Sequence, residues 1–402
     1  MRSHCVRILV TVVALAASAC TSAAPAPPTA APPAAAKPTT APTTAAAPTT
    51  AAAPTTAAAP TTVAAPTTAA GPTTAAAPTA AAAAKPAATT APPAAPAAPL
   101  QKLAVAYSNV SADDLASWVA KEAGIYAQNG LNVDLQLVAG GSKTMAALLS
   151  GQEDLTLQGG GEVLSASASG ADLVVLAALA PVYPYLFEVS PDIKTIDDLR
   201  GKKVGVSSAG GSADIASRVA LKKQGLDPDV DVTFVAVDSH ANRTAALISG
   251  AIQAGVDDPP DSFEVERHGL HPLFDLAALK LPAAQTVLTG QRAWVNANRE
   301  TTQKFVDSLV QGIARMRADK PFTIGVLKKY FDSDDEEAMS GAYDFFVKEV
   351  TQPAPFVRPE HFADAAAILG EKNDKIKTVD LSRVIDASFV QSAVDRGLPS
   401  SQ

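Results

Sequence analysis

Short apolar runs alternate with helical segments from residue 103 to residue 256, and no other feature of the sequence constrains the fold as strongly. Runs typical of buried strands lie at residues 103–107, 133–138, 155–157, 174–179, 203–206, 232–237 and 252–256. Strands separated by helices pair in parallel through βαβ units. The pattern restarts after residue 179 and becomes mostly helical from residue 301. It therefore predicts an α/β protein with two lobes and a helical C-terminal region.

Glycine and serine occupy three turns that lead from a predicted strand into a predicted helix. The clusters are Gly140, Gly141 and Ser142; Gly159, Gly160 and Gly161; and Ser207, Ser208, Gly210, Gly211 and Ser212. Glycine lets the backbone approach a ligand closely, and a helix N-terminus offers unpaired N–H groups. For any one cluster, the need for a tight turn is a sufficient explanation of the glycines. Three clusters at equivalent positions predict a ligand cleft at the carboxyl ends of the strands, although none fits a nucleotide-binding motif.

The first 20 residues have the layout of an export signal. Two arginines precede an apolar run at residues 8–19, which ends in small residues just before Cys20. A membrane-spanning helix needs about 20 apolar residues, so this run is too short to be one. Lipid-modified cysteines usually follow a leucine by three residues, and here that place holds Ala17. We expect a lipoprotein-type signal with lipidation at Cys20, and an ordinary cleaved signal with a spare cysteine is the alternative.

Residues 21–99 are of low complexity. They contain no acidic and no aromatic residue, and the hexad TTAAAP occurs six times in succession between Thr43 and Pro78, with Val63 and Gly71 as its only departures. A short Pro-containing repeat without large apolar residues has nothing to bury. The segment is therefore predicted to be a disordered, extended linker between the signal and the folded part.

The charge and the cysteine content of the remaining chain exclude several classes of function. After residue 100 there are 28 Lys and Arg against all 40 Asp and Glu, a net charge of −12, which argues against a nucleic-acid partner. No cysteine follows Cys20, so this part has no disulfide and no thiolate metal site. His268 and His271 are three residues apart, but Gly269 and Pro272 make a helix that would place them on one face improbable. We therefore expect no metal and no cofactor.

Four segments of the chain carry a family resemblance. They are WVAKEAGIYAQNGLNVDLQLVAGG, ALLSGQEDLTLQGGG, IDDLRGKKVGVSSAGGSADIASRVALKKQGLDPDVDV and, near the end, IDASFVQSAVDRG. In order and spacing they resemble the solute-binding proteins of ABC transporters of the nitrate, sulfonate and taurine type. That family also includes thiamine-precursor-binding proteins and a related pyrimidine-synthesising enzyme. The resemblance extends from residue 103 to residue 397.

The resemblance implies a type II periplasmic-binding-protein fold, in which two Rossmann-like lobes joined by a hinge close on a small molecule. Lobe I would comprise residues 100–186 and 286–402, and lobe II residues 187–285. The chain would cross between the lobes near residues 185–187 and again near residues 285–287.

The resemblance also implies ligand contacts from both lobes. The contacts would be Ser108, Gly141, Ser142, Gly160 and Gly161 from lobe I, and Ser208, Gly211 and Ser212 from lobe II. Arg218 and Arg243 lie on predicted helices of lobe II, where they could hold an acidic ligand or face solvent.

Other side chains are candidates with a structural alternative, and we include Trp118, Tyr185 and Asp258 among the predicted ligand contacts. Trp118 lies on the apolar side of a predicted helix, so a place in the core competes with one at the cleft edge. Tyr183 and Tyr185 could stack on a ligand or pack in the interior. Asp257 and Asp258 precede two prolines; facing the cleft they would favour a cationic or amino-bearing solute, and otherwise they form a solvated turn.

The sequence thus predicts an extracytoplasmic, membrane-anchored monomer that binds a small organic or anionic solute and delivers it to an ABC permease and ATPase. A surface sensor or stalk with the same fold is the alternative. The pyrimidine-synthesising enzyme uses a cysteine-rich iron motif, which this chain lacks after Cys20. No GxSxG or HExxH motif occurs either, so we expect no enzymatic activity.

Overall fold

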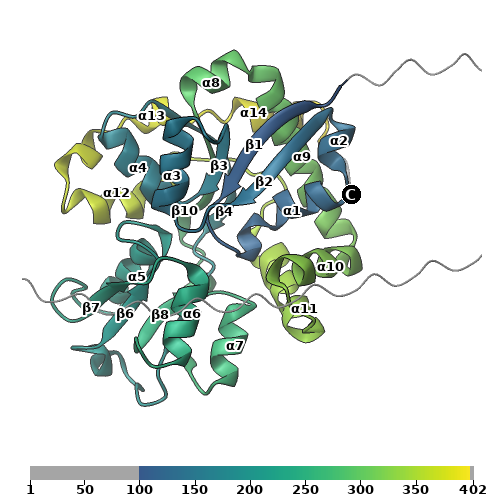
Figure 1. Ribbon diagram of the computed structural model, residues 1–402. Coiled ribbons are helices and arrows are strands. Elements are labelled where there is room, and N and C mark those ends of the chain that lie inside the picture. The colour runs from purple at the N-terminus through teal and green to yellow at the C-terminus, as the bar shows by residue number, and fades with distance from the viewer. Residues whose placement is uncertain (1–98, 399–402) are drawn as a thin grey trace, which may run out of the picture. The chain divides into compact units, whose positions relative to one another are not determined.

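The computed structural model describes residues 99–398, so the predicted signal, Cys20 and nearly all of the linker lie outside the described residues. Within this part the strands form two five-stranded sheets, with the orders β2-β1-β3-β10-β4 and β7-β6-β8-β5-β9. Figure 1 shows each sheet with its own helices. The predicted α/β class with two lobes is confirmed.

The first sheet is mixed rather than purely parallel. Its strands are β1 (Gln101–Tyr107), β2 (Leu131–Leu137), β3 (Leu155–Gln158), β4 (Leu173–Val182) and β10 (Pro282–Gln291). β1 pairs in parallel with β2 and β3, as the alternation predicts. β10, which the sequence did not reveal as a strand, runs antiparallel between β3 and β4.

Helices follow the first three strands of this sheet in the predicted order. They are α1 (Leu115–Glu122), α2 (Ile125–Gln128), α3 (Gly141–Ser150) and α4 (Gly160–Ala168). α3 and α4 both begin within the glycine clusters that follow β2 and β3, so their N-termini lie at the carboxyl edge of the sheet.

The second sheet repeats the arrangement on a smaller scale. Its strands are β5 (Leu186–Val189), β6 (Lys203–Val206), β7 (Thr233–Ala236), β8 (Ala254–Asp257) and β9 (His271–Asp275), and its helices are α5 (Ser212–Lys223), α6 (His240–Ile248) and α7 (Asp261–Arg267). β6 is parallel to β7 and β8, whereas β5 is antiparallel to β8 and β9.

The chain passes between the two sheets twice. The first passage is at residues 183–185, between β4 and β5, and the second is at residues 276–281, between β9 and β10. Residues 285–287, expected near the second crossing, lie inside β10.

The C-terminal region is helical, as predicted. Its helices are α8 (Arg292–Ala297), α9 (Arg299–Ala318), α10 (Lys320–Phe331), α11 (Glu336–Phe345), α12 (Ala363–Gly370), α13 (Leu381–Val384) and α14 (Ser388–Asp395). α9 buries Phe305, Leu309 and Ile313, which recur every four residues on one helix face. Gly312 lets α9 approach α1 closely, because a Cβ there would lie 2.4 Å from the carbonyl oxygen of Ala116.

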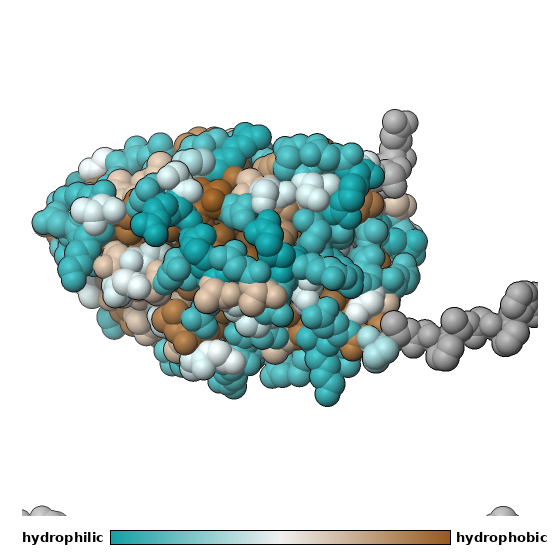
Figure 2. All heavy atoms as spheres, turned by 90° about the horizontal axis from the view of Figure 1, so that it is seen from above, coloured by the Kyte–Doolittle hydropathy of each residue, from teal (hydrophilic) through white to brown (hydrophobic). Residues whose placement is uncertain are grey.

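Two large apolar clusters hold these layers together. One joins the first sheet to α1, α9, α10 and α11. The other includes Val163 of α4 together with Phe187 and Val204 of the second sheet, so one apolar cluster extends through both lobes. In the view of Figure 2 the surface is mostly hydrophilic, with separate small apolar patches. Among residues 99–398, no helix has the length and apolar character needed to span a bilayer.

Candidate ligand-binding cleft

A cleft with about 40 Å³ of free space lies where the carboxyl ends of the strands of the two sheets face each other. From the first lobe it is lined by Ser108, Asn109, Gly140, Gly141, Gly159 and Glu162, and from the second by Ser207, Ser208, Gly211, Ser212, Ala213, Ser239, His240 and Arg243. Tyr185 and Gln285 complete the lining beside the crossings.

The structure brings together many of the residues predicted to contact a ligand. Those that line the cleft are Ser108, Gly141, Tyr185, Ser208, Gly211 and Ser212. They come from the turns after β1, β2 and β6 and from the first crossing. Their meeting follows from the topology, because the carboxyl ends of parallel strands lie at one edge of each sheet.

Other predicted contacts lie elsewhere. Trp118 is fully buried in the core, where its ring stacks on Tyr330 with 4.5 Å between the ring centroids. It therefore packs in the core and does not lie at the cleft edge. Ser142 is exposed in the first turn of α3 and is not part of the cleft lining.

Gly160 and Gly161 lie behind the lining and serve close packing instead. A Cβ on Gly160 would lie 2.4 Å from the Cβ of Ala284. A Cβ on Gly161 would lie 2.4 Å from the carbonyl oxygen of Gly210, in the turn between β6 and α5 of the other lobe. The glycine at 161 therefore lets the two lobes touch backbone to backbone.

Further contacts close the lobes around the cleft. Ser212 Oγ, at the start of α5, donates a hydrogen bond of 3.1 Å to the carbonyl oxygen of Gln285 in β10. Ser111 Oγ, which follows β1, donates one of 3.3 Å to Asp258 Oδ2 in the other lobe. The structure thus holds the lobes in a closed arrangement.

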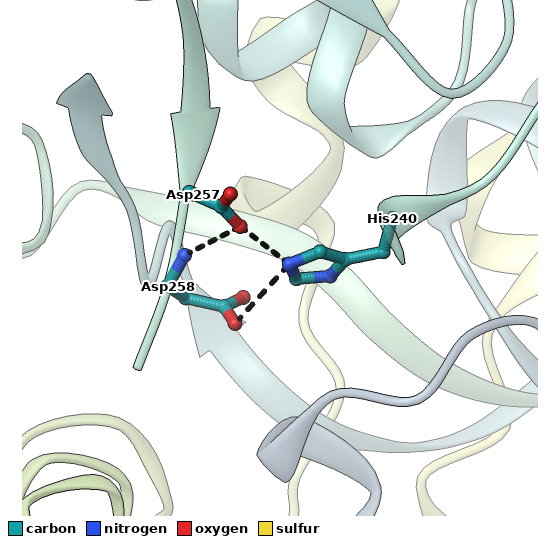
Figure 3. A group of neighbouring side chains, drawn as sticks. All are labelled: His240, Asp257 and Asp258. Atoms are coloured by element: carbon teal, nitrogen blue, oxygen red, sulfur yellow. Dashed lines mark hydrogen bonds and ion pairs between the residues drawn. The ribbon is translucent and has the colours of Figure 1, made fainter. Parts of the chain in front are cut away.

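Asp257 and Asp258 do not form a solvated turn. Both are buried at the end of β8, and neither is part of the cleft lining. His240 Nε2 lies 2.5 Å from Asp257 Oδ1 and 3.8 Å from Asp258 Oδ1 (Figure 3), and 3.2 Å from Asp261 Oδ2. Arg243 Nη2 also donates to Asp257 Oδ1, at 3.4 Å.

These contacts determine the protonation states of His240, Asp257 and Asp258. Burial opposes the charged form of His240, but the negative charge of Asp257 raises the pKa of this histidine to about 9. Burial also opposes ionisation of Asp257, but the charges of His240 and Arg243 hold its pKa below the ordinary value. Burial raises the pKa of Asp258 well above its usual range. At neutral pH, Asp257 is therefore an anion shared by two cations.

His240, Asp257 and Asp258 have the residue types of a metal site, but their spacing is that of an ion-pair network. Metal ligands each stand about 2.0–2.2 Å from the ion, and in tetrahedral geometry neighbouring ligand atoms are over 3 Å apart. The 2.5 Å between His240 Nε2 and Asp257 Oδ1 leaves no room for an ion between them. The guanidinium of Arg243 on the same oxygen also opposes a cation.

Glu162 lines the cleft from the first turn of α4. Its Oε2 is buried and has no hydrogen-bond partner. Burial raises the pKa of Glu162 to about 7, and a hydrogen bond from its own backbone N–H partly opposes the shift.

Several lining residues escaped prediction from the sequence, chiefly Asn109, Glu162, His240 and Gln285, while Arg243 was predicted only as one of two possibilities. A local signal existed for His240, because it begins α6 directly after β7, as the glycine clusters begin their helices. Arg218, the other candidate, pairs with Asp214 and Asp229 away from the cleft.

Comparison with known proteins shows the same fold in binding proteins. "Putative binding protein YtlA" of Bacillus subtilis (strain 168) is 22% identical over 300 residues, which cover 73% of this chain and 90% of that protein. The ligand-binding component of an ABC-type import system from Staphylococcus aureus, solved with zinc bound, has a TM-score of 0.62 at 14% identity over 73% of this chain and 99% of its own. The periplasmic aliphatic sulphonate binding protein SsuA from Escherichia coli has a TM-score of 0.57 at 22% identity, covering 71% and 92%.

These likenesses confirm the predicted periplasmic-binding-protein fold. All three proteins carry names of binding proteins or binding components. The family model described as NMT1/THI5 like matches residues 113–321, just over half of the 402 residues. The chain therefore belongs to the NMT1/THI5-like family.

Proposed function

We propose that this chain captures one small solute between its two lobes and delivers it to an ABC importer. The observation that carries the proposal is the cleft lined by polar groups of both lobes. A solute held there contacts Ser108 and Gly141 on one side and Ser208 and Ser212 on the other. Because it binds both lobes only when they are together, it shifts the equilibrium toward the closed form that an importer would recognise.

The proposal includes an anchored monomer on the outer face of the cell membrane. The layout of residues 1–20 supports export, and Cys20 supplies the thiol for a lipid. Residues 21–99 would then serve as a tether that lets the lobes reach both solute and transporter.

Solute capture is tested by thermal unfolding of the full-length protein against a library of small cations, anions and neutral metabolites. A solute at 100 times its dissociation constant stabilises the folded state by about 2.7 kcal/mol, and the midpoint of unfolding rises accordingly. We expect at least one solute to raise the midpoint in a saturable way. A library without any such compound would contradict the proposal.

The anchor is tested by metabolic labelling of cells with a fatty-acid analogue. The wild-type protein should incorporate the label and remain with the membrane, whereas Cys20→Ala should incorporate none. Cys5→Ala is the matched control, since Cys5 lies before the predicted cleavage site and should not affect labelling. Labelling of Cys20→Ala at the wild-type level would rule out lipidation at this residue.

A further inference from the structure

We infer that the bound solute carries a cationic or N–H-donating head group that pairs with Glu162, and that a free anion such as a sulfonate is not the natural ligand. The inference rests on the proposed function, because it names the class of solute that the same cleft would take. This class differs from the aliphatic sulphonates for which the Escherichia coli protein SsuA is named.

The first observation is the position of the Glu162 carboxylate. Its Oε2 is buried without a partner. Its Oε1 fills the space between the two lobes: a Cβ on Gly141 would lie 2.0 Å from this oxygen, and one on Gly211 would lie 2.9 Å from it. Two glycine turns, one from each lobe, thus leave the room that this carboxylate occupies.

That room is where an anionic ligand would be expected. Gly141 begins α3 and Gly211 precedes α5, helices of 10 and 12 residues whose N-termini carry partial positive charge. The carboxylate of Glu162 lies between these two N-termini. A sulfonate or nitrate entering the cleft would meet a like charge at the position where the helix dipoles would otherwise attract it.

The positively charged side chains of the cleft do not offset the negative charge of Glu162. His240 and Arg243 supply the positive side chains of the described lining, and both contact the buried carboxylate of Asp257. Glu162 has no such partner: burial raises its pKa, the hydrogen bond from its own backbone N–H partly opposes the rise, and no neighbouring charge contributes. The carboxylate that lacks a counter-charge is therefore the one that a cationic solute would satisfy.

A second free acceptor lies in the same cleft. Gln285 Oε1 is buried without a partner, while its Nε2 donates a hydrogen bond of 2.5 Å to the hydroxyl of Tyr185. Two unpartnered acceptor oxygens favour a ligand with several N–H donors, because a buried acceptor left without a donor costs free energy. Amines and amidines have this character.

A purely structural role for Glu162 makes a different prediction. As an acidic residue in the first turn of α4, it would stabilise the helix through the dipole. Glu162→Gln would then lower stability and leave solute affinity and solute-linked proton release unchanged.

The test compares a matched pair of probes, benzamidine and benzenesulfonate, which share a ring and differ in charge. Calorimetric titrations use the full-length protein, Glu162→Gln and the control Glu188→Gln. Glu188 is a good control because it is buried with both carboxylate oxygens unpartnered, yet lies in β5 and outside the cleft lining. The amidine should bind wild type and Glu188→Gln within twofold of each other, and Glu162→Gln at least tenfold more weakly.

Proton release gives a readout that a structural role would not move. Pairing with a cation favours the ionised carboxylate, so wild type should release a proton on binding near pH 7, and the measured heat should differ between phosphate and Tris buffers. Glu162→Gln should lose that difference. Binding of benzenesulfonate in place of benzamidine, or unchanged affinity in Glu162→Gln, would overturn the inference and leave the proposed function standing. Failure of both probes and of every library solute to bind would overturn both.

Discussion

His240 and Asp257 link the stability of the folded chain to pH. The pKa of His240 is raised to about 9 in the folded protein and is about 6.5 in an unfolded chain. Its stabilising charge is therefore complete below about pH 6.5 and is lost as the pH rises through 9. Glu188 acts in the same direction, because burial raises its pKa to about 8 and its ionisation destabilises the folded state.

We therefore predict that the free energy of unfolding falls between pH 6.5 and pH 9. Glu188 keeps its part of the slope in His240→Gln, so this variant should show a shallower fall over the same window. The measurement is urea unfolding at several pH values. The control is His268→Gln, an exposed histidine on the same lobe, which should keep the wild-type slope. Equal slopes in wild type and His240→Gln would show that the buried pair is not the source.

The sequence alone identified those cleft residues that belong to a recognisable local turn. Ser208, Gly211 and Ser212 stand out because they belong to a turn of glycine and serine between a predicted strand and a predicted helix, and this pattern is visible in the local sequence. Glu162 and Arg243 do not stand out, because charged residues in helices are ordinarily exposed. Their burial depends on how the two lobes meet, which involves residues far apart in the sequence.

At the level of elements, α4 and the turn before α5 touch closely across the lobes, and we expect this contact to limit closure. Gly161→Ala would place a Cβ 2.4 Å from the carbonyl oxygen of Gly210 and 2.5 Å from Cδ1 of Ile215. Backbone cannot yield easily there, so we predict that the lobes are held apart and that affinity for a solute found in the library falls at least tenfold. Titration calorimetry gives the affinity, and small-angle scattering should show a larger radius for the solute-bound variant.

Gly325→Ala is the control for that substitution. Gly325 lies in α10, and a Cβ added there would have no atom within 4 Å. Alanine should therefore raise stability through helix propensity by up to about 1 kcal/mol and leave affinity unchanged. If Gly161→Ala bound the solute like wild type, closure would not depend on this backbone contact.

The parallel strands and their helices could be predicted because each is a local pattern of apolar residues. β10 could not, since Gln285, Thr286 and Thr289 interrupt its apolar run and resemble a loop. These side chains are buried because β10 is inserted between β3 and β4, which lie far earlier in the chain. β10 is thus defined by long-range pairing rather than by local composition.

At the level of the whole molecule, function depends on two lobes that meet around one cleft. The apolar cluster that runs through both sheets holds the lobes together beside the crossings. The polar contacts across the lobes include the hydrogen bonds of Ser111 and Ser212 and ion pairs such as Arg267–Asp335 and Lys222–Glu371. Opening of the cleft would break the polar contacts that surround it, while the apolar cluster keeps the lobes joined.

The central claim is that the solute binds between the lobes, and titration calorimetry on two tryptophan variants tests it most directly. Ser208 lines the cleft, so the large ring in Ser208→Trp should fill it; Ser142 is exposed outside the lining, so Ser142→Trp is the matched control. With the solute found in the library, wild type and Ser142→Trp should bind one molecule per chain with equal affinity, and Ser208→Trp, still folded by circular dichroism, should bind none. Wild-type binding by Ser208→Trp would contradict the claim.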